Sequence, residues 1–210
     1  MSNPIILFWV SLFLSYLLGS IPSAYIFVRI IKKQDIRKLG SGNVGATNAM
    51  RVLGKKWGIL ILAIDMLKGF IPTIFIADYI LFKFKYPSAE LLRLLMGFSA
   101  VIGHNWPVFL NFKGGKGVAT TFGVMLALTL KINGFIWVVL SSLGIWATVF
   151  SISKIVSVAS IVSAITLPIF MLIFKQNIYL IFISIIFSSL ILIRHLPNIQ
   201  RLLQGKELRI

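Results

Sequence analysis

Residues 57–82 have the sequence WGILILAIDMLKGFIPTIFIADYILF. The run is longer than the roughly 20 apolar residues that an α-helix needs to cross a bilayer. Asp65 and Lys68 lie near its middle, three residues apart, so they can pair on one helix face and lower each other's cost of burial. We therefore predict a membrane-spanning helix here, in which this pair has either a functional or a purely structural role.

Six further apolar windows flank this run along the chain. They cover residues 4–28, 91–112, 118–130, 134–150, 155–174 and 178–193, and the window at 118–130 is short for a span. The composition agrees, since 58% of residues are apolar and the mean hydropathy is +0.96. We predict an all-α, polytopic membrane protein with seven transmembrane helices, forming one domain over residues 1–210.

The start of the first window indicates a retained helix. A secretory signal peptide would begin with lysine or arginine and end at a small-residue cleavage site. Residues 1–4 carry no basic side chain, and no such cleavage site stands out. We therefore count this window among the seven spans.

The basic residues predict the orientation, because short loops rich in lysine and arginine stay in the cytoplasm. One set of alternate connections holds five, at Lys83, Lys85, Arg93, Lys131 and Lys175. The other set holds fifteen, at Arg29, Lys32, Lys33, Arg37, Lys38, Arg51, Lys55, Lys56, Lys113, Lys116, Lys154, Arg194, Arg201, Lys206 and Arg209. The N-terminus is therefore expected outside and the C-terminus in the cytoplasm.

Charge and composition narrow the partners and the chemistry. The net charge is +16, but the cations lie between apolar runs, where they meet the lipid bilayer and anionic substrates, so nucleic acid is not an expected partner. The chain has no cysteine, which excludes disulfides and an acyl-cysteine intermediate. Because its five acids and two histidines form no cluster with metal-ligand spacing, we expect no metal and no cofactor.

Four polar segments fall on the cytoplasmic side by this count and can meet at one membrane face. They are residues 40–51, 103–117, 151–160 and 194–207. In the first, GSGNVGATNAMR, glycines let backbone N–H groups point at an anion. Arg51 supplies a planar guanidinium group that can donate two parallel hydrogen bonds to a phosphate. Short hydrogen-bonding side chains accompany them at Ser41, Asn43, Thr47 and Asn48.

The first segment also contains the pattern GxGxxG, at Gly40, Gly42 and Gly45. That pattern indicates a dinucleotide site only when it follows a strand in a βαβ unit, and here it follows a basic run after a membrane helix. We reject the dinucleotide interpretation. A flexible solvated loop stays open as an alternative.

The second segment, GHNWPVFLNFKGGKG, leads into the window at 118–130. Glycines before a helix N-terminus make an anion site, because unpaired N–H groups and the positive end of the helix dipole converge there. The spacing is not that of a Walker A loop, and Val118 offers no hydroxyl for magnesium. The alternative is a loop whose lysines only set topology.

The last two segments carry hydroxyl, amide and imidazole groups. In SISKIVSVAS, Ser157 lies three residues after Lys154, which suits either an anion or simple helix packing. In RHLPNIQRLLQGKE, a helix would place His195, Asn198 and Arg201 on one face, although Pro197 counts against a helix. Ordinary juxtamembrane anchoring is the alternative for these basic residues.

Two catalytic arrangements are missing from the sequence. Neither histidine has an acid five residues later, which removes the HxxxxD arrangement of the common glycerolipid acyltransferases. A Ser-His-Asp triad lacks an acid close to either histidine in sequence. The remaining possibility is a reaction that the protein promotes by positioning phosphate groups.

Taken together, GSGNVGATNAMR, the DMLKG of residues 65–69, GHNWPVFLNFKGGKGVAT and RHLPNIQRLLQGKE resemble the bacterial acyl-phosphate:glycerol-3-phosphate acyltransferases, the PlsY family. The resemblance covers essentially the whole chain. It implies transfer of a fatty acyl group from acyl phosphate to the 1-hydroxyl of glycerol 3-phosphate, giving lysophosphatidic acid and phosphate. It also implies a bacterial inner-membrane protein with a cytoplasmic site, coupled to an enzyme that forms acyl phosphate.

The resemblance assigns the site residues. The catalytic set is Ser41, Arg51, Lys116, His195 and Asn198. The substrate-binding set is Gly40, Gly42, Asn43, Thr47, Asn48, His104, Gly114, Gly115, Gly117, Ser157, Arg201 and Glu207.

The proton acceptor and two rival functions stay open at this stage. Either His195 or a substrate phosphate oxygen can take the hydroxyl proton, and we expect the phosphate to do so while His195 orients ligands. A transporter for an anionic phosphate metabolite is the main alternative, but it should show broken helices and repeat symmetry. A purely structural membrane subunit would leave the clustered Asn, Ser and Gly residues unexplained.

Overall fold

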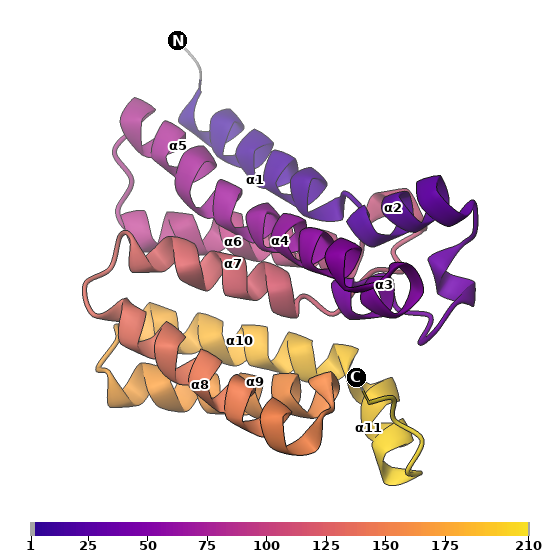
Figure 1. Cartoon of the computed structure of the whole chain (residues 1–210). Helices are drawn as coiled ribbons and strands as arrows, with labels where there is room; N and C mark the ends of the chain where they lie inside the picture. Colours follow the sequence, from indigo (N-terminus) through magenta and orange to yellow (C-terminus); the bar gives the residue numbers. More distant parts are fainter. Residues whose placement is uncertain (1–2, 210) are drawn as a thin grey trace. The chain divides into compact units, whose positions relative to one another are not determined.

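The computed structural model describes residues 3–209, which are all-helical and contain no strand, as predicted (Figure 1). The chain divides after Leu128 into two compact units, residues 1–128 and 129–210. The single domain inferred from the sequence stays a prediction.

The first unit contains the helices up to α7. They are α1 (Pro4–Ser20), α2 (Ser23–Lys32), η1 (Ile36–Lys38), α3 (Ala46–Leu53), α4 (Lys55–Ile71), the π-helical segment η2 (Pro72–Ile76), α5 (Ala77–Lys83), α6 (Ala89–Asn105), η3 (Val108–Leu110) and α7 (Val118–Thr129). The last residue of α7 lies beyond the unit boundary.

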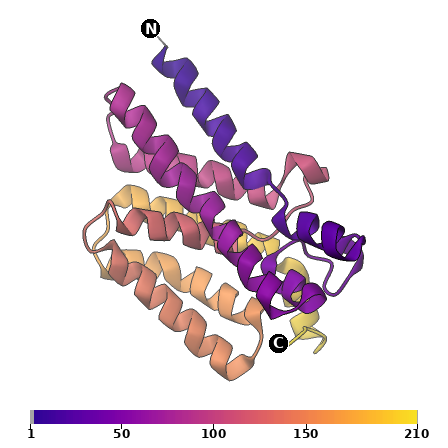
Figure 2. The same cartoon turned by 45° about the horizontal axis from the view of Figure 1, so that its top comes forward.

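One predicted window is interrupted and another ends earlier than expected, and a proline lies at or just after each break. The window 4–28 is interrupted between α1 and α2, where Ile21 and Pro22 leave the helix and the chain turns (Figure 2). The window 91–112 ends as a helix at Asn105, and Pro107 follows two residues later. Proline lacks an N–H and disfavours helical geometry in the residue before it, which accounts for both breaks.

Small residues let α1 lie close to α6. A Cβ on Gly19 would overlap the carbonyl oxygen of Ala100, and one on Gly103 would overlap that of Tyr16. The close approach also allows the Ser99 hydroxyl to donate to the carbonyl of Leu12 at 2.8 Å. Such contacts hold membrane helices together, because lipid offers no hydrophobic drive for their association.

The contact between α4 and α7 is built in the same way. A Cβ on Gly69 would overlap the carbonyl of Thr120, and one on Gly123 would overlap that of Met66. The two helices therefore meet backbone to backbone, and α4 holds its buried charges next to the segment that leads into α7.

The π-helical segment carries the chain through Pro72. A proline inside a helix removes one hydrogen bond and clashes with the preceding turn, and a π-bulge absorbs the mismatch. The Thr73 hydroxyl donates to the carbonyl of Gly69 at 2.8 Å, and Arg93 donates to the carbonyl of Thr73 at 3.2 Å. Arg93 also pairs with Asp78, so one buried cation ties α6 to η2 and α5.

The second unit contains α8 (Phe135–Ser153), α9 (Val156–Ile173), α10 (Ile178–Arg194) and α11 (Leu196–Leu203). Helix α9 packs against both α8 and α10. Hydroxyl groups link these helices: Ser163 donates to the carbonyl of Ser142 at 3.0 Å, and Ser188 donates to that of Ala164 at 2.6 Å.

The helices are those of an integral membrane protein. Four segments among the described residues are long and apolar enough to cross a bilayer: Pro4–Lys32, Lys55–Lys83, Phe135–Ser153 and Val156–Ile173. The pair α10 and α11, bent by 53°, is a fifth candidate, whereas α7 is an apolar helix of only 12 residues. Large apolar side chains such as Trp9, Phe13 and Phe182 lie exposed, as a lipid environment allows. The seven spans and their orientation stay predictions.

Candidate active site

A single carboxamide organises the first polar segment. Asn48 is 1% exposed and lies in the first turns of α3. Its Oδ1 accepts the N–H of Ser41 at 2.8 Å, and its Nδ2 donates to the carbonyls of Leu39 at 3.0 Å and Asn43 at 2.9 Å. Asn48, predicted to bind substrate, is thus engaged by the loop backbone and fixes the shape of residues 39–43.

Glycine is needed at two turns of this loop. Gly40 and Gly42 have φ values of +56° and +73°, in the left-handed region that side chains disfavour. A Cβ on Gly40 would also overlap the Asn48 carboxamide. The remaining predicted residues of the segment, Ser41, Asn43, Thr47 and Arg51, are half-buried, and Arg51 lies in the last turn of α3.

The second polar segment folds back onto the end of α6. Gly114 and Gly115 are buried against His104, and the Gly115 N–H donates to the carbonyl of His104 at 3.0 Å. A Cβ on Gly114 would overlap that same carbonyl and Pro107. The glycines are therefore required by close packing, and Lys116 follows them half-buried.

The segment then leads into α7 through Gly117, whose φ is +78°. Asn105, which the sequence analysis did not select, lies beside this turn and is completely buried. Its side-chain oxygen and nitrogen have no hydrogen-bond partner among the described residues. A polar residue directly after His104 was the signal available in the sequence.

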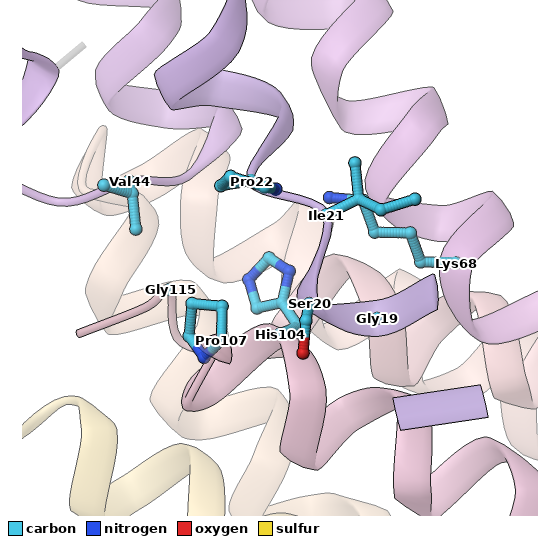
Figure 3. Close-up of a pocket in the computed structure, with 9 residues that line it drawn as sticks. All are labelled: Gly19, Ser20, Ile21, Pro22, Val44, Lys68, His104, Pro107 and Gly115. Carbon is cyan, nitrogen blue, oxygen red and sulfur yellow. The ribbon is translucent and has the colours of Figure 1, made fainter. Parts of the chain in front are cut away.

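The two segments of the first unit share a small pocket. Val44 from the first segment lines it with His104, Pro107 and Gly115 from the second, as Figure 3 shows. The other lining residues come from the break after α1 and from α4, and they are Gly19, Ser20, Ile21, Pro22 and Lys68. The structure thus brings together two motifs that lie some 60 residues apart in sequence.

The predicted pair of charges in α4 is confirmed. Lys68 Nζ lies 2.5 Å from Asp65 Oδ1, and both side chains are buried. Ser23 at the start of α2, which the sequence analysis missed, donates to the same carboxylate oxygen at 2.6 Å. Its position directly after the Ile-Pro break was the only clue in the sequence.

In the second unit, a backbone carbonyl orients His195. The residue lies between α10 and α11 and is 2% exposed. Its Nδ1 is 2.7 Å from the carbonyl oxygen of Ile191. Because a carbonyl oxygen only accepts, Nδ1 carries the proton, and Nε2 is the acceptor nitrogen when the ring is neutral.

Glu207 joins three predicted residues of this unit. The hydroxyl of Ser157 and the Nδ2 of Asn198 donate to its Oε1 at 2.8 Å and 2.5 Å, and Arg201 donates to its Oε2 at 2.8 Å. The segment from Leu196 is helical, so Asn198 and Arg201 do share one face. Pro197 occupies the first turn of α11, where proline fits a helix, and this removes the objection drawn from the sequence.

These contacts determine the titration of the Glu207 carboxyl. Burial by itself would raise its pKa, but hydrogen bonds from Asn198, Arg201 and Ser157, together with the charge of Arg201, leave that pKa below its ordinary value. Glu207, predicted to bind substrate, is therefore a carboxylate held by protein donors from α9 and α11. Among residues 3–209, no group of three His, Asp or Glu side chains is placed to hold a metal ion.

Comparison with known proteins identifies the family. The model of the family described as glycerol-3-phosphate acyltransferase matches residues 9–205. The chain is a member of that family. A glycerol-3-phosphate acyltransferase from Prochlorococcus marinus strain MIT 9215 is 42% identical over 201 residues, covering 95% of each chain. One from Trichormus variabilis is 40% identical over 208 residues, covering 93% of this chain and 88% of the relative.

Solved structures agree with the acyltransferase family. The crystal structure of PlsY (YgiH), an integral membrane glycerol 3-phosphate acyltransferase, in its glycerol 3-phosphate form has a TM-score of 0.84 and 39% identity, covering 97% of this chain and 95% of that one. The lysophosphatidic acid form has a TM-score of 0.81 and 38% identity over the same shares. The resemblance to the PlsY family seen in the sequence is thereby confirmed.

Proposed function

We propose that this acyltransferase moves a fatty acyl group from acyl phosphate to the 1-hydroxyl of sn-glycerol 3-phosphate, giving lysophosphatidic acid and inorganic phosphate. Family membership supports an acyltransferase acting on glycerol 3-phosphate. The donor is the one that the resemblance to the PlsY family implies. The polar segments are compatible with it, because they offer cations and glycine backbone for phosphates, and the chain has no cysteine to carry an acyl group.

The reaction suits a site that acts mainly by positioning its two substrates. The hydroxyl oxygen attacks the carbonyl carbon of the mixed anhydride, a C–O bond forms, and the bond to the phosphate oxygen breaks with its electron pair. Phosphate is a good leaving group, so little acid assistance is needed. The main demands are to hold two phosphates close together and to keep the hydroxyl near the carbonyl.

We assign the acceptor to the first polar segment. Arg51 can hold the phosphate of glycerol 3-phosphate with two parallel hydrogen bonds, as its planar fork allows. The Asn48 carboxamide supports this role, because it fixes the backbone of Ser41, whose hydroxyl is then presented from an ordered loop. Substrate therefore meets Ser41 and Arg51, while Asn48 shapes the loop.

We assign the donor phosphate to the second polar segment and Lys116. The close-packed glycines lead into the N-terminus of α7, where a helix can bind an anion, and the half-buried Lys116 adds a positive charge. The hydroxyl proton goes to an oxygen of the departing phosphate. His195, held through Nδ1, orients the substrate, and Asn198 lies on the following turn.

The protein is proposed to lie in the bacterial cytoplasmic membrane with seven spans and its site toward the cytoplasm. The excess of basic residues on one set of connections supports that orientation. Glycerol 3-phosphate and the enzyme that supplies acyl phosphate would then be on the same side as the site.

A donor comparison tests the proposed reaction. Purified protein is mixed with glycerol 3-phosphate and palmitoyl phosphate, and free phosphate is followed, with palmitoyl-CoA as the alternative donor. We expect phosphate release that needs glycerol 3-phosphate and does not occur with the CoA ester. Activity with palmitoyl-CoA alone, or no phosphate release, would overturn the proposed donor.

A further inference from the structure

The ion pair inside α4 has no role in the reaction described above. Asp65 is 1% exposed and Lys68 is 4% exposed, within the candidate span Lys55–Lys83. Ionisable side chains within a membrane are costly to bury and are usually retained for a function.

The pair faces His104. Asp65 Oδ1, which already accepts from Ser23 and Lys68, lies 3.9 Å from Nδ1 of the imidazole. On its other edge, the ring lies against the second polar segment, since a Cβ on Gly115 would overlap Nε2. Figure 3 shows the imidazole between Gly115 and Pro107 on one side and Lys68 on the other.

The imidazole is a support for the loop above it. The Gly115 N–H is bonded to the backbone carbonyl of His104, so the same residue contacts the loop through both its ring and its main chain. The pocket beside the ring, into which Ser20 also faces, has room for about one water molecule and is too small for a substrate phosphate. Rotation of this ring would displace Gly115 and, with it, Lys116.

We propose that Asp65 and Lys68 are positioning residues for the donor-binding loop. The carboxylate, held by Lys68 and Ser23, lies 3.9 Å from Nδ1 of His104, and its negative charge favours the ring orientation that turns Nδ1 toward Asp65. The ring in turn holds residues 114–117 where they meet the donor phosphate. The kinetic part of this inference rests on the donor proposed above, and the orientation of the ring does not.

A second buried ion pair in the same unit provides a matched control. Arg93 is 6% exposed and pairs with Asp78. Arg93 precedes His104 by 11 residues on α6, which is about 16 Å along the helix axis. Loss of this pair should destabilise the unit without reaching the glycine loop.

The test compares two double substitutions that neutralise each pair together. Asp65→Asn with Lys68→Met is set against Asp78→Asn with Arg93→Met, so that neither variant leaves an unpaired buried charge. Ser23→Ala accompanies them as a milder change that keeps both charges and removes one hydrogen bond to Asp65. Melting temperature in detergent, the KM values for both substrates and the ¹⁵N signals of the imidazoles are measured.

The two histidines of the chain make the ring directly observable. In ¹⁵N-histidine-labelled protein, His195→Ala assigns the remaining signals to His104. We expect the Asp65/Lys68 variant to shift these signals and to raise the KM for palmitoyl phosphate about tenfold or more, with a smaller change for glycerol 3-phosphate. Ser23→Ala should shift the His104 signals and raise the KM for palmitoyl phosphate in the same direction, but by less. The Asp78/Arg93 variant should lower only the melting temperature.

Unchanged imidazole signals in folded Asp65/Lys68 and Ser23 variants would overturn the inference, whatever donor the enzyme uses. Equal rises in both KM values, or a donor KM that the control variant raises as much, would overturn it as well. If the Asp65/Lys68 variant does not fold, the Ser23→Ala variant tests the inference instead. Unchanged imidazole signals, or equal rises in the two KM values, in that variant would overturn it. Inactivity of the wild type with palmitoyl phosphate would contradict the proposed donor and leave the imidazole result standing.

Discussion

At the residue scale, the structure shows which polar side chains hold the loops in shape. The sequence predicts that Asn48, Ser41 and Arg51 belong to one segment. It does not predict that the Asn48 carboxamide is used by the backbone at residues 39–43. Such bonds depend on where a loop closes, and composition does not determine that. The same holds for Ser23, which becomes relevant only because α2 starts next to Asp65.

Arg51→Lys tests the predicted bidentate contact with glycerol 3-phosphate. Lysine keeps the charge and loses the planar fork, so one of two parallel hydrogen bonds is lost. We expect the KM for glycerol 3-phosphate to rise roughly tenfold, as a loss of about 1.4 kcal/mol implies. The KM for the donor and the melting temperature should stay close to wild type. A rise in the donor KM alone would move Arg51 to the other phosphate.

His195→Ala separates orientation from proton transfer. If the departing phosphate takes the proton, the imidazole contributes mainly through orientation, and turnover should fall by less than the 10²-fold to 10⁴-fold typical of a lost general base. Single-turnover rates and binding of glycerol 3-phosphate to the variant measure this. Intact binding with a loss of turnover inside that range would make His195 the base.

The lowered pKa of the Glu207 carboxyl predicts that the protein loses stability in acid. Its folded pKa lies below the unfolded value of 4.5, so its contribution is complete above about pH 4.5 and is lost as the pH falls through the lower folded pKa. We expect melting temperature to fall with acid in the wild type, and the gap to Glu207→Gln to close. The Arg37 hydrogen bond lowers the pKa of Asp35 to about 2, but Asp35 is common to both proteins. A gap that stays constant from pH 6 to pH 3 would contradict this role.

At the element scale, helices follow from apolar windows, and their ends follow from proline and from packing. The windows predict most of the helical residues, but they pass over Pro22 and beyond Asn105, where the chain actually leaves the helix. The pair of charges in α4 is predictable because it depends on spacing within one helix. The glycine contacts between helices are not, because they join residues distant in sequence.

Gly123→Ala tests the backbone contact between α4 and α7. The added methyl group meets the carbonyl of Met66, so the helices must move apart, at a cost of about 1–3 kcal/mol. We expect a lower melting temperature. Gly144→Ala on α8 is the control, because nothing lies within 4 Å of its Cβ position, and it should be neutral or slightly stabilising. Equal effects of the two substitutions would argue against the close contact.

At the scale of the whole molecule, the sequence predicts the class of protein and the family. An all-helical membrane protein follows from the long apolar runs, and the ordered set of polar motifs resembles the PlsY family before any comparison is made. The number of spans is harder to predict, because α7 is short and α10 continues into α11 through a 53° bend. Length alone does not say whether such helices cross the bilayer.

The orientation of the chain can be measured with single cysteines, since the natural chain has none. Lys85 and Ser151 are exposed and lie on connections that the charge count assigns to opposite sides. Replacing Lys85 removes a basic residue from the set of connections that holds only five of them, so the excess of positive charge on the other set is kept. In intact cells, Ser151→Cys should resist a membrane-impermeant maleimide until the membrane is opened, and Lys85→Cys should react at once. The reverse pattern would invert the proposed topology.

The proposed reaction is direct acyl transfer from a phosphate donor to the 1-hydroxyl of glycerol 3-phosphate. It is tested most directly by giving the wild-type enzyme glycerol 3-phosphate labelled with ¹⁸O at that hydroxyl, together with palmitoyl phosphate, and analysing both products by mass spectrometry. We expect one unlabelled phosphate for each lysophosphatidic acid, with the ¹⁸O retained in the new ester. Labelled phosphate, or lysophosphatidic acid formed only when palmitoyl-CoA is supplied, would contradict it.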